Sequence, residues 1–225
     1  MEQVSFGYRT AWLALRTEGR DAVVRALGLR NVVPATPTVG IQRSNEWDPA
    51  AVAGPVFVSP PVHGWMLCVG QAWLTIADAR PPAFGDLVAR LSGELRCDAQ
   101  FFCTHRVVES HGWARAVNGK LLRAYLYVGE SGETPLNYGE PTPDELHLGF
   151  ALFAPSADGG SRAAASPAEE DVIRLAARWS VNPTSLPAMA DGVLGELPGR
   201  TAESATRSRT SGASGTGSKP WWKVW

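Results

Sequence analysis

The sequence WARAVNGKLLRAY, residues 113–125, carries the clearest local signal of how this chain folds. Asn118-Gly119 separates two runs of strand-forming residues, and this dipeptide favours a type I′ hairpin turn because both residues tolerate positive φ angles. We expect residues 113–117 and 120–125 to pair as antiparallel strands. The hairpin therefore predicts an antiparallel sheet as the basis of the fold.

Other runs of strand-forming residues extend this sheet along the chain. The longer runs are residues 8–17, 64–69 and 100–108, and shorter runs fall at 31–34, 56–58 and 150–153. Residues 35–54 and 129–149 have too little periodicity to predict more than loops with a helical turn. We expect an α+β fold over residues 1–199, with a mostly antiparallel sheet of about six strands and three main helices packed on it.

The three helices are predicted by apolar residues that recur at helical spacing. The first runs from Asp21 to Leu27, and Gly28 suits the left-handed conformation that ends a helix. The second follows Pro81-Pro82, and the third opens with Ser166-Pro167-Ala168-Glu169, which matches a capping box. Their expected buried stripes are Val23, Val24 and Leu27; Phe84, Leu87, Val88 and Leu91; and Val172, Leu175, Ala176 and Trp179.

The charge of the chain is unevenly distributed. The chain has 225 residues and a formal net charge of −1; residues 200–225 carry +4, which leaves −5 on residues 1–199. An acidic body argues against a surface that follows nucleic-acid phosphates, so we expect no nucleic-acid partner. Complementary fields favour another protein, and a basic one, as the partner.

Cysteine content and hydropathy favour a cytoplasmic location. Cys68, Cys97 and Cys103 fit no paired metal or redox spacing and are expected to be reduced, packed thiols. The first residues have neither a basic start nor an apolar run, and no later stretch is long enough to span a membrane, so we expect no integral membrane contact. The 18 Arg against 3 Lys indicate a GC-rich bacterial genome.

The C-terminal tail differs in kind from the rest of the chain. Residues 200–218 contain no Leu, Ile, Val or aromatic residue, so this Ser/Gly/Thr-rich segment is predicted to be a disordered, flexible linker. Residues 219–225 then form a Trp-rich motif in which Trp221, Trp222, Trp225 and Lys223 are the candidate partner-binding residues. We expect this motif to dock on its own domain, on a neighbouring copy or on a partner. Shallow contact with an anionic membrane is a further alternative.

The other tryptophans are assigned by their place in the predicted elements. Four fall on strands or helices and are expected in the core. One of the remaining two is expected to be a surface anchor for a partner. The core set is Trp12, Trp65, Trp113 and Trp179, and the candidate anchors are Trp47 and Trp73.

A dense polar cluster provides the candidate catalytic or metal-binding residues His105, Glu109 and His111. On one continuous strand the two histidines would lie about 20 Å apart, at about 3.3 Å per residue, which is too far for one metal ion. A turn at Glu109-Ser110 would instead bring them together across an antiparallel pair. The alternative is that these side chains are structural or solvated.

Cys103 is a second candidate, as a nucleophile assisted by His105. On a strand the two side chains share a face at roughly 6–7 Å, too far for a direct hydrogen bond without a bend. The alternative is that Cys103 packs beside Phe101 in the core. We expect no cofactor, since the chain has no nucleophile elbow, phosphate loop or dinucleotide fingerprint.

Two functional hypotheses follow from these patterns. The first is a cytoplasmic bacterial protein-binding module, an immunity-type or adaptor protein, with a tethered aromatic docking peptide at its C-terminus. The second is a small metal-dependent or thiol hydrolase that uses His105, Glu109 and His111. The absence of catalytic motifs favours the first hypothesis.

Overall fold

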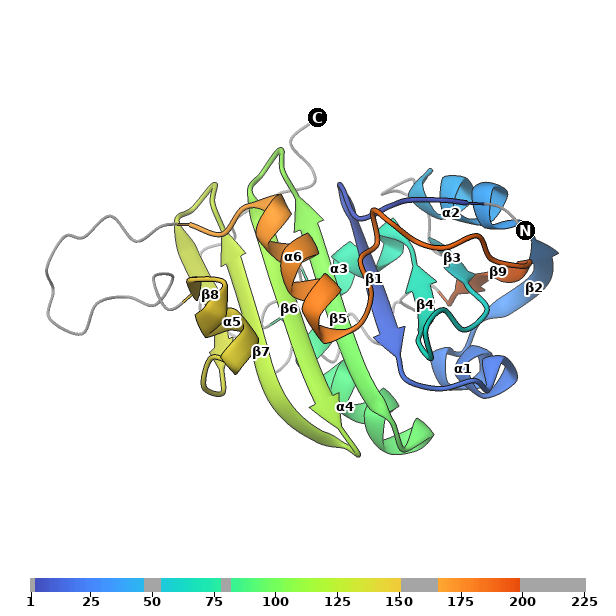
Figure 1. Cartoon of the computed structure of the whole chain (residues 1–225), viewed down its shortest axis with the longest axis horizontal. Helices are drawn as coiled ribbons and strands as arrows, with labels where there is room; N and C mark the ends of the chain where they lie inside the picture. The colour runs from blue at the N-terminus through green and yellow to red at the C-terminus, as the bar shows by residue number, and fades with distance from the viewer. Residues whose placement is uncertain (1–2, 47–53, 78–81, 151–165, 199–225) are drawn as a thin grey trace, which may run out of the picture.

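An antiparallel sheet organises the structure (Figure 1). The computed structural model describes residues 3–46, 54–77, 82–150 and 166–198, and within these ranges nine strands pair in the order β2-β9-β3-β4-β1-β5-β6-β7-β8. The strands are β1 (Thr10–Leu15), β2 (Arg30–Ala35), β3 (Gly54–Val58), β4 (Met66–Val69), β5 (Asp98–His105), β6 (Ser110–Val117), β7 (Lys120–Val128), β8 (Glu133–Tyr138) and β9 (Gly192–Leu197).

Helices cover both faces of this sheet. They are α1 (Arg20–Leu27), α2 (Pro37–Asn45), the 3₁₀ helix η1 (Gln71–Trp73), α3 (Leu74–Ala77), α4 (Phe84–Leu95), α5 (Pro143–His147) and α6 (Glu169–Trp179). One apolar core lies under α1, α3 and α4, and the other lies under α2 and α6. Figure 1 shows α6 and α5 in front of the sheet and α4 behind it. Among the described residues, no helix is long and apolar enough to cross a membrane.

The predicted hairpin is confirmed. Asn118 and Gly119 have φ angles of 49° and 86°, as the type I′ turn requires, and Val117 pairs with Lys120. The pairing continues to Ser110 and Val128, with an irregularity beside Arg115.

The three predicted helices are present, but α6 begins later than predicted. Gly28 ends α1 with a φ of 66°, and Phe84, Val88 and Leu91 of α4 are fully buried. Ser166 does not cap α6, which starts at Glu169. Its N-terminus is closed by Asp171, whose Oδ2 accepts a hydrogen bond from the backbone N–H of Ala168 (3.0 Å).

The prediction of about six strands and three helices was too low. The α+β class and the mostly antiparallel sheet are confirmed, and α5 is the helical turn predicted within residues 129–149, but β8, β9 and α2 occupy stretches that were predicted as loops or assigned no element. The expected strand at 150–153 is described only at Phe150, which lies in a helical turn and not in a strand. Residues 199–225 and Trp47 lie outside the described residues, so the linker at 200–218 and the docking motif at 219–225 remain predictions.

The tryptophans expected in the core are there, and one candidate anchor is not on the surface. Trp73 is 1% exposed, and its Nε1 donates to the carbonyl oxygen of Cys68 (3.1 Å). A row of aromatic side chains crosses the sheet on the α6 side, from β3 through β1, β5 and β6 to β7. Its members are Phe57, Trp12, Phe102, Trp113 and Tyr125. Trp113 and Tyr125 also line the cavity described below.

Candidate functional site

The predicted histidine cluster is divided between two strands. β5 ends at His105 and β6 begins at Ser110, with a turn over residues 106–109, so the continuous strand to Val108 was wrong. His111 pairs with Thr104 and His105 pairs with Ser110. The turn thus brings the two histidines onto neighbouring strands, as the alternative interpretation expected.

His111 belongs to a buried hydrogen-bond network. It is 3% exposed, and its Nδ1 lies 2.8 Å from Oγ1 of Thr104, which donates to Oε1 of Glu169 (3.2 Å). The same Oε1 accepts from the backbone N–H of Arg9 (2.8 Å). This network joins Arg9, which precedes β1, and strands β5 and β6 to the first residue of α6.

Neither histidine is charged near neutral pH in this setting. Burial, and then the neighbouring His105, lower the pKa of His111 to about 4. Burial, and then the charge of Arg9, lower the pKa of His105 from its ordinary value. Both rings are therefore weak proton acceptors.

Acid is expected to destabilise the protein through His111. The imidazole titrates near pH 6.5 in the unfolded chain and at about 4 in the folded one, so the unfolded state binds more protons between these values. The stability conferred by neutral His111 is present above pH 6.5 and is lost as the pH falls towards 4. We expect protonation of His111 to lower the free energy of unfolding by about 2–3 kcal/mol between pH 7.5 and 4.5. Urea unfolding of the native chain and of His111→Asn measures it, and an equal acid loss in both would contradict the assignment.

Glu109 does not join the histidines in a metal site. It is exposed in the turn, with a φ of 49°, and its carbonyl oxygen accepts from the backbone N–H of Gly129 (3.0 Å). Within the described ranges, no group of three or more His, Cys, Asp or Glu side chains is placed to hold a metal ion. The three predicted residues therefore do not form one chelating set.

Cys103 is packed in the core. It is 1% exposed in the same core as Phe101, and burial raises the pKa of its thiol to about 12. A protonated, inaccessible thiol is not a nucleophile. The geometry thus favours the packing interpretation over the thiol hydrolase.

A cavity that the sequence analysis missed lies at the other end of the aromatic row. Its volume is about 350 Å³, within the range of small-molecule and side-chain pockets. It is formed by β6, β7 and β8 with the loop that leads into α5. Its lining is Trp113, Arg123, Tyr125, Asn137, Gly139, Glu140, Pro141, Glu145 and Phe150. We call it the aromatic cavity.

The aromatic walls are held by mutual packing. The rings of Trp113 and Tyr125 stack with centroids 4.6 Å apart, and Phe150 lies 5.3 Å from Trp113. Burial raises the pKa of Tyr125, so its hydroxyl stays neutral at neutral pH. All three side chains are at most 4% exposed, so the aromatic wall of the cavity is buried.

Glu145 fixes the floor of the cavity. It is fully buried, and its Oε1 accepts hydrogen bonds from Nε1 of Trp113 and Nε of Arg123, both at 2.8 Å. Its Oε2 accepts from the backbone N–H of Thr142 (2.8 Å), the N-cap of α5. One carboxylate therefore ties α5 to two strands of the sheet.

Groups of the protein itself surround the positive charge of Arg123 and bind it. Besides Glu145, its Nη1 donates to Oδ1 of Asn137 (2.7 Å) and to the carbonyl oxygens of Tyr138 and Gly139 (3.0 Å each). The guanidinium also lies 5.4 Å from the centre of the Tyr125 ring. Because these groups already satisfy it, Arg123 offers little to an anionic ligand.

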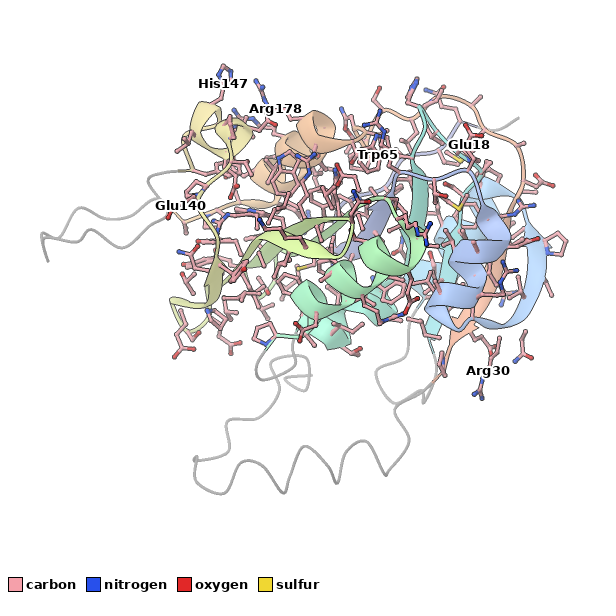
Figure 2. The ribbon with its side chains drawn as sticks, turned by 90° about the horizontal axis from the view of Figure 1, so that it is seen from below. Glu18, Arg30, Trp65, Glu140, His147 and Arg178 are labelled. Carbon is pink, nitrogen blue, oxygen red and sulfur yellow. The ribbon has the colours of Figure 1, made fainter. Side chains whose placement is uncertain are left out.

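The segment that supplies β8 and the cavity rim is acidic, and Glu140 is the exposed acidic residue of the cavity lining. Residues 124–150 contain five acidic residues and no Lys or Arg, which accounts for the whole net charge of −5 on residues 1–199. Glu145 is buried against Arg123, and Asp144 forms an ion pair with Arg178 of α6 (3.4 Å). Glu130, Glu133 and Glu140 are exposed on and beside β8, and we call them the acidic edge. Figure 2 shows Glu140 toward one end of the molecule and Glu18 toward the other.

The uneven distribution of acidic residues along the sequence is the signal that could have indicated this site. A run of 27 residues without a basic side chain is visible in the sequence, but the burial of Glu145 and the stacking of Trp113 on Tyr125 depend on long-range pairing. Comparison of the chain with known protein families, curated proteins and solved structures gave no match. Its function must therefore be inferred from this geometry.

Proposed function

We propose that this chain is a cytoplasmic protein-binding module that receives a basic, aromatic segment of a partner protein in the aromatic cavity. The observation that carries the proposal is the combination of stacked Trp113 and Tyr125 walls with the acidic edge beside them. Aromatic side chains are the most common anchors of protein interfaces, and a rim of one charge steers a partner of the opposite charge. An immunity-type or adaptor role fits such a site.

The electrostatics support a cationic ligand over an anionic one. The one basic side chain in the cavity lining, Arg123, already pairs with Glu145, whereas Glu140 at the rim is exposed. A phosphate or carboxylate would meet the field of the acidic edge, whereas Lys or Arg side chains would be attracted by it.

The hydrolase alternative receives less support from the described residues. Cys103 is buried, Glu109 faces solvent in a turn, and His111 is engaged by Thr104. By contrast, Glu140 is exposed at the rim of the cavity, beside the buried rings of Trp113, Tyr125 and Phe150.

Charge reversal at the rim is expected to weaken partner binding. A suitable probe is a labelled peptide that contains Lys and Trp, titrated into the full chain at low salt. We expect Glu140→Lys to raise the dissociation constant about three- to tenfold, and Glu133→Lys to add to the effect, because an attraction becomes a repulsion.

Glu18→Lys is the matched control, since it makes the same change in net charge on an exposed residue at the far end of the molecule (Figure 2). Equal losses for Glu18→Lys and Glu140→Lys would show a general charge effect and would contradict a site at the acidic edge.

A further inference from the structure

The ligand chemistry that the site demands is present in the same chain. Residues 219–225, Lys-Pro-Trp-Trp-Lys-Val-Trp, contain three indole rings and two ammonium groups. We propose that this Trp-rich motif binds in the aromatic cavity of its own molecule and excludes the partner until the partner displaces it. This inference rests on the proposed function, because it names an internal competitor for the same site.

Charge complementarity supports this occupant. The segment from residue 200 onward carries +4, while residues 124–150 carry −5. Lys219 and Lys223 lie close to the tryptophans in sequence, so an indole in the cavity would bring an ammonium group to the exposed carboxylate of Glu140 at the rim. The rest of residues 1–199 is neutral overall.

The lining of the cavity suits an indole ring. A volume of about 350 Å³ gives room for one such ring with part of a neighbouring side chain. Trp113, Tyr125 and Phe150 line the cavity and are the groups available for aromatic packing there. Asn137 and the acidic rim supply acceptors for the indole N–H.

The linker has the length needed to reach the cavity of its own molecule. β9, which ends at Leu197, and β7 are six positions apart in the sheet, or about 29 Å at about 4.8 Å per strand. A flexible Gly/Ser-rich segment the length of residues 198–218 has a root-mean-square end-to-end distance of about 25 Å. A linker whose mean length matches the span gives the highest effective concentration of a tethered ligand, in the millimolar range. Binding within one molecule is therefore favoured over binding between copies at micromolar concentration.

The test compares the native full chain with the full-length variant Trp221→Ser/Trp222→Ser/Trp225→Ser. The probe is a labelled peptide of the sequence Lys-Pro-Trp-Trp-Lys-Val-Trp, titrated into each protein at low salt. We expect the variant to bind the peptide at least tenfold more tightly, because its own competitor is gone. Adding Glu140→Lys to the variant should weaken the peptide again by about three- to tenfold.

Each failure has a distinct meaning. Equal peptide affinity for the native chain and the variant would overturn the internal competitor and leave the proposed binding site intact. No peptide binding to either protein would overturn the proposed function as well. Peptide binding that ignores Glu140→Lys would place the peptide elsewhere and overturn the inference.

Sedimentation of the native chain separates binding within a molecule from binding between copies. We expect a monomer at micromolar concentration in both the native chain and the variant. A dimer that disappears in the variant would overturn binding within one molecule and would assign the motif to the neighbouring copy.

Discussion

Replacing Glu145 with alanine is expected to lower the free energy of unfolding by about 3–5 kcal/mol, since it leaves the buried Arg123 guanidinium without its counter-charge. The substitution also removes the acceptor of the Trp113 indole N–H and of the Thr142 backbone N–H. Equilibrium unfolding in urea, followed by circular dichroism, measures the change. The loss should also open the aromatic cavity, because α5 then loses its hydrogen bonds to Trp113 and Arg123 of the sheet.

Asp144→Ala is the matched control for this prediction. Asp144 neighbours Glu145 in α5 and also pairs with an arginine, but its ion pair with Arg178 is partly exposed on both sides. Exposed pairs contribute about 0–1 kcal/mol, so this variant should be nearly as stable as the native chain. Similar losses for both variants would show that burial of the Arg123–Glu145 pair is not what makes Glu145 important.

A double substitution of the pair should recover part of the loss. Arg123→Met with Glu145→Met removes both charges and leaves no uncompensated ion in the interior. We expect this protein to be more stable than either single variant, although the carbonyl oxygens that Arg123 contacts lose a donor. If the double variant loses as much free energy of unfolding as the sum of the losses in the two single variants, the two side chains are not coupled.

The second large effect is expected from Gly139→Ala. Backbone strain and a steric clash together should lower the free energy of unfolding by about 2–4 kcal/mol. Gly139 has a φ of 75°, and a Cβ at this position would collide with the carbonyl oxygen of Leu122. Backbone atoms cannot move aside as a side-chain end can, so the loop at the cavity rim must shift. Urea unfolding and peptide binding should both report the change.

Gly132→Ala isolates the conformational part of this effect. Gly132 also has a positive φ, of 65°, but no atom lies within 4 Å of the position that a Cβ would occupy. We therefore expect a cost of about 1–2 kcal/mol from the left-handed conformation without a collision. If Gly139→Ala lowers the free energy of unfolding no more than Gly132→Ala does, the close approach to Leu122 does not constrain the loop.

Local patterns predicted the parts of the fold that are specified locally. The turn at Asn118-Gly119, the end of α1 at Gly28 and the buried stripe of α4 each depend on neighbours in sequence, and each is confirmed. Helix α6 was predicted, but its start was not. Glu169 contributes to long-range contacts with Thr104 and Arg9, which the Ser166 capping pattern does not encode.

The two strands that were not predicted, β8 and β9, lack the local sequence patterns of a strand. β9 carries Gly192 and Gly195 because its backbone approaches neighbouring groups closely, and glycine in a strand weakens its sequence signal. β8 lies at the edge of the sheet, contains Pro135 and buries no face fully, so it lacks the alternation of a half-buried strand. Both strands exist because of the partner strands beside them.

The candidate site was harder to predict than the fold for the same reason. The residues of the histidine cluster are close in sequence, yet His111 belongs to a buried network and Glu109 is exposed in a turn. The aromatic cavity draws its side chains from β6, β7, β8 and the loop before α5, and their convergence depends on register. Only the acidic run over residues 124–150 was visible beforehand.

The indole N–H signal of Trp113 in a ¹⁵N–¹H correlation spectrum tests the central claim most directly. Its ring forms a wall of the aromatic cavity, and its N–H is held by Glu145, whereas Trp73 is buried in the opposite core. When a Lys- and Trp-containing peptide is titrated into the full-length triple variant Trp221→Ser/Trp222→Ser/Trp225→Ser, the Trp113 signal should shift and saturate while the Trp73 signal stays in place. An unchanged Trp113 signal at saturating peptide would contradict a binding site in the aromatic cavity.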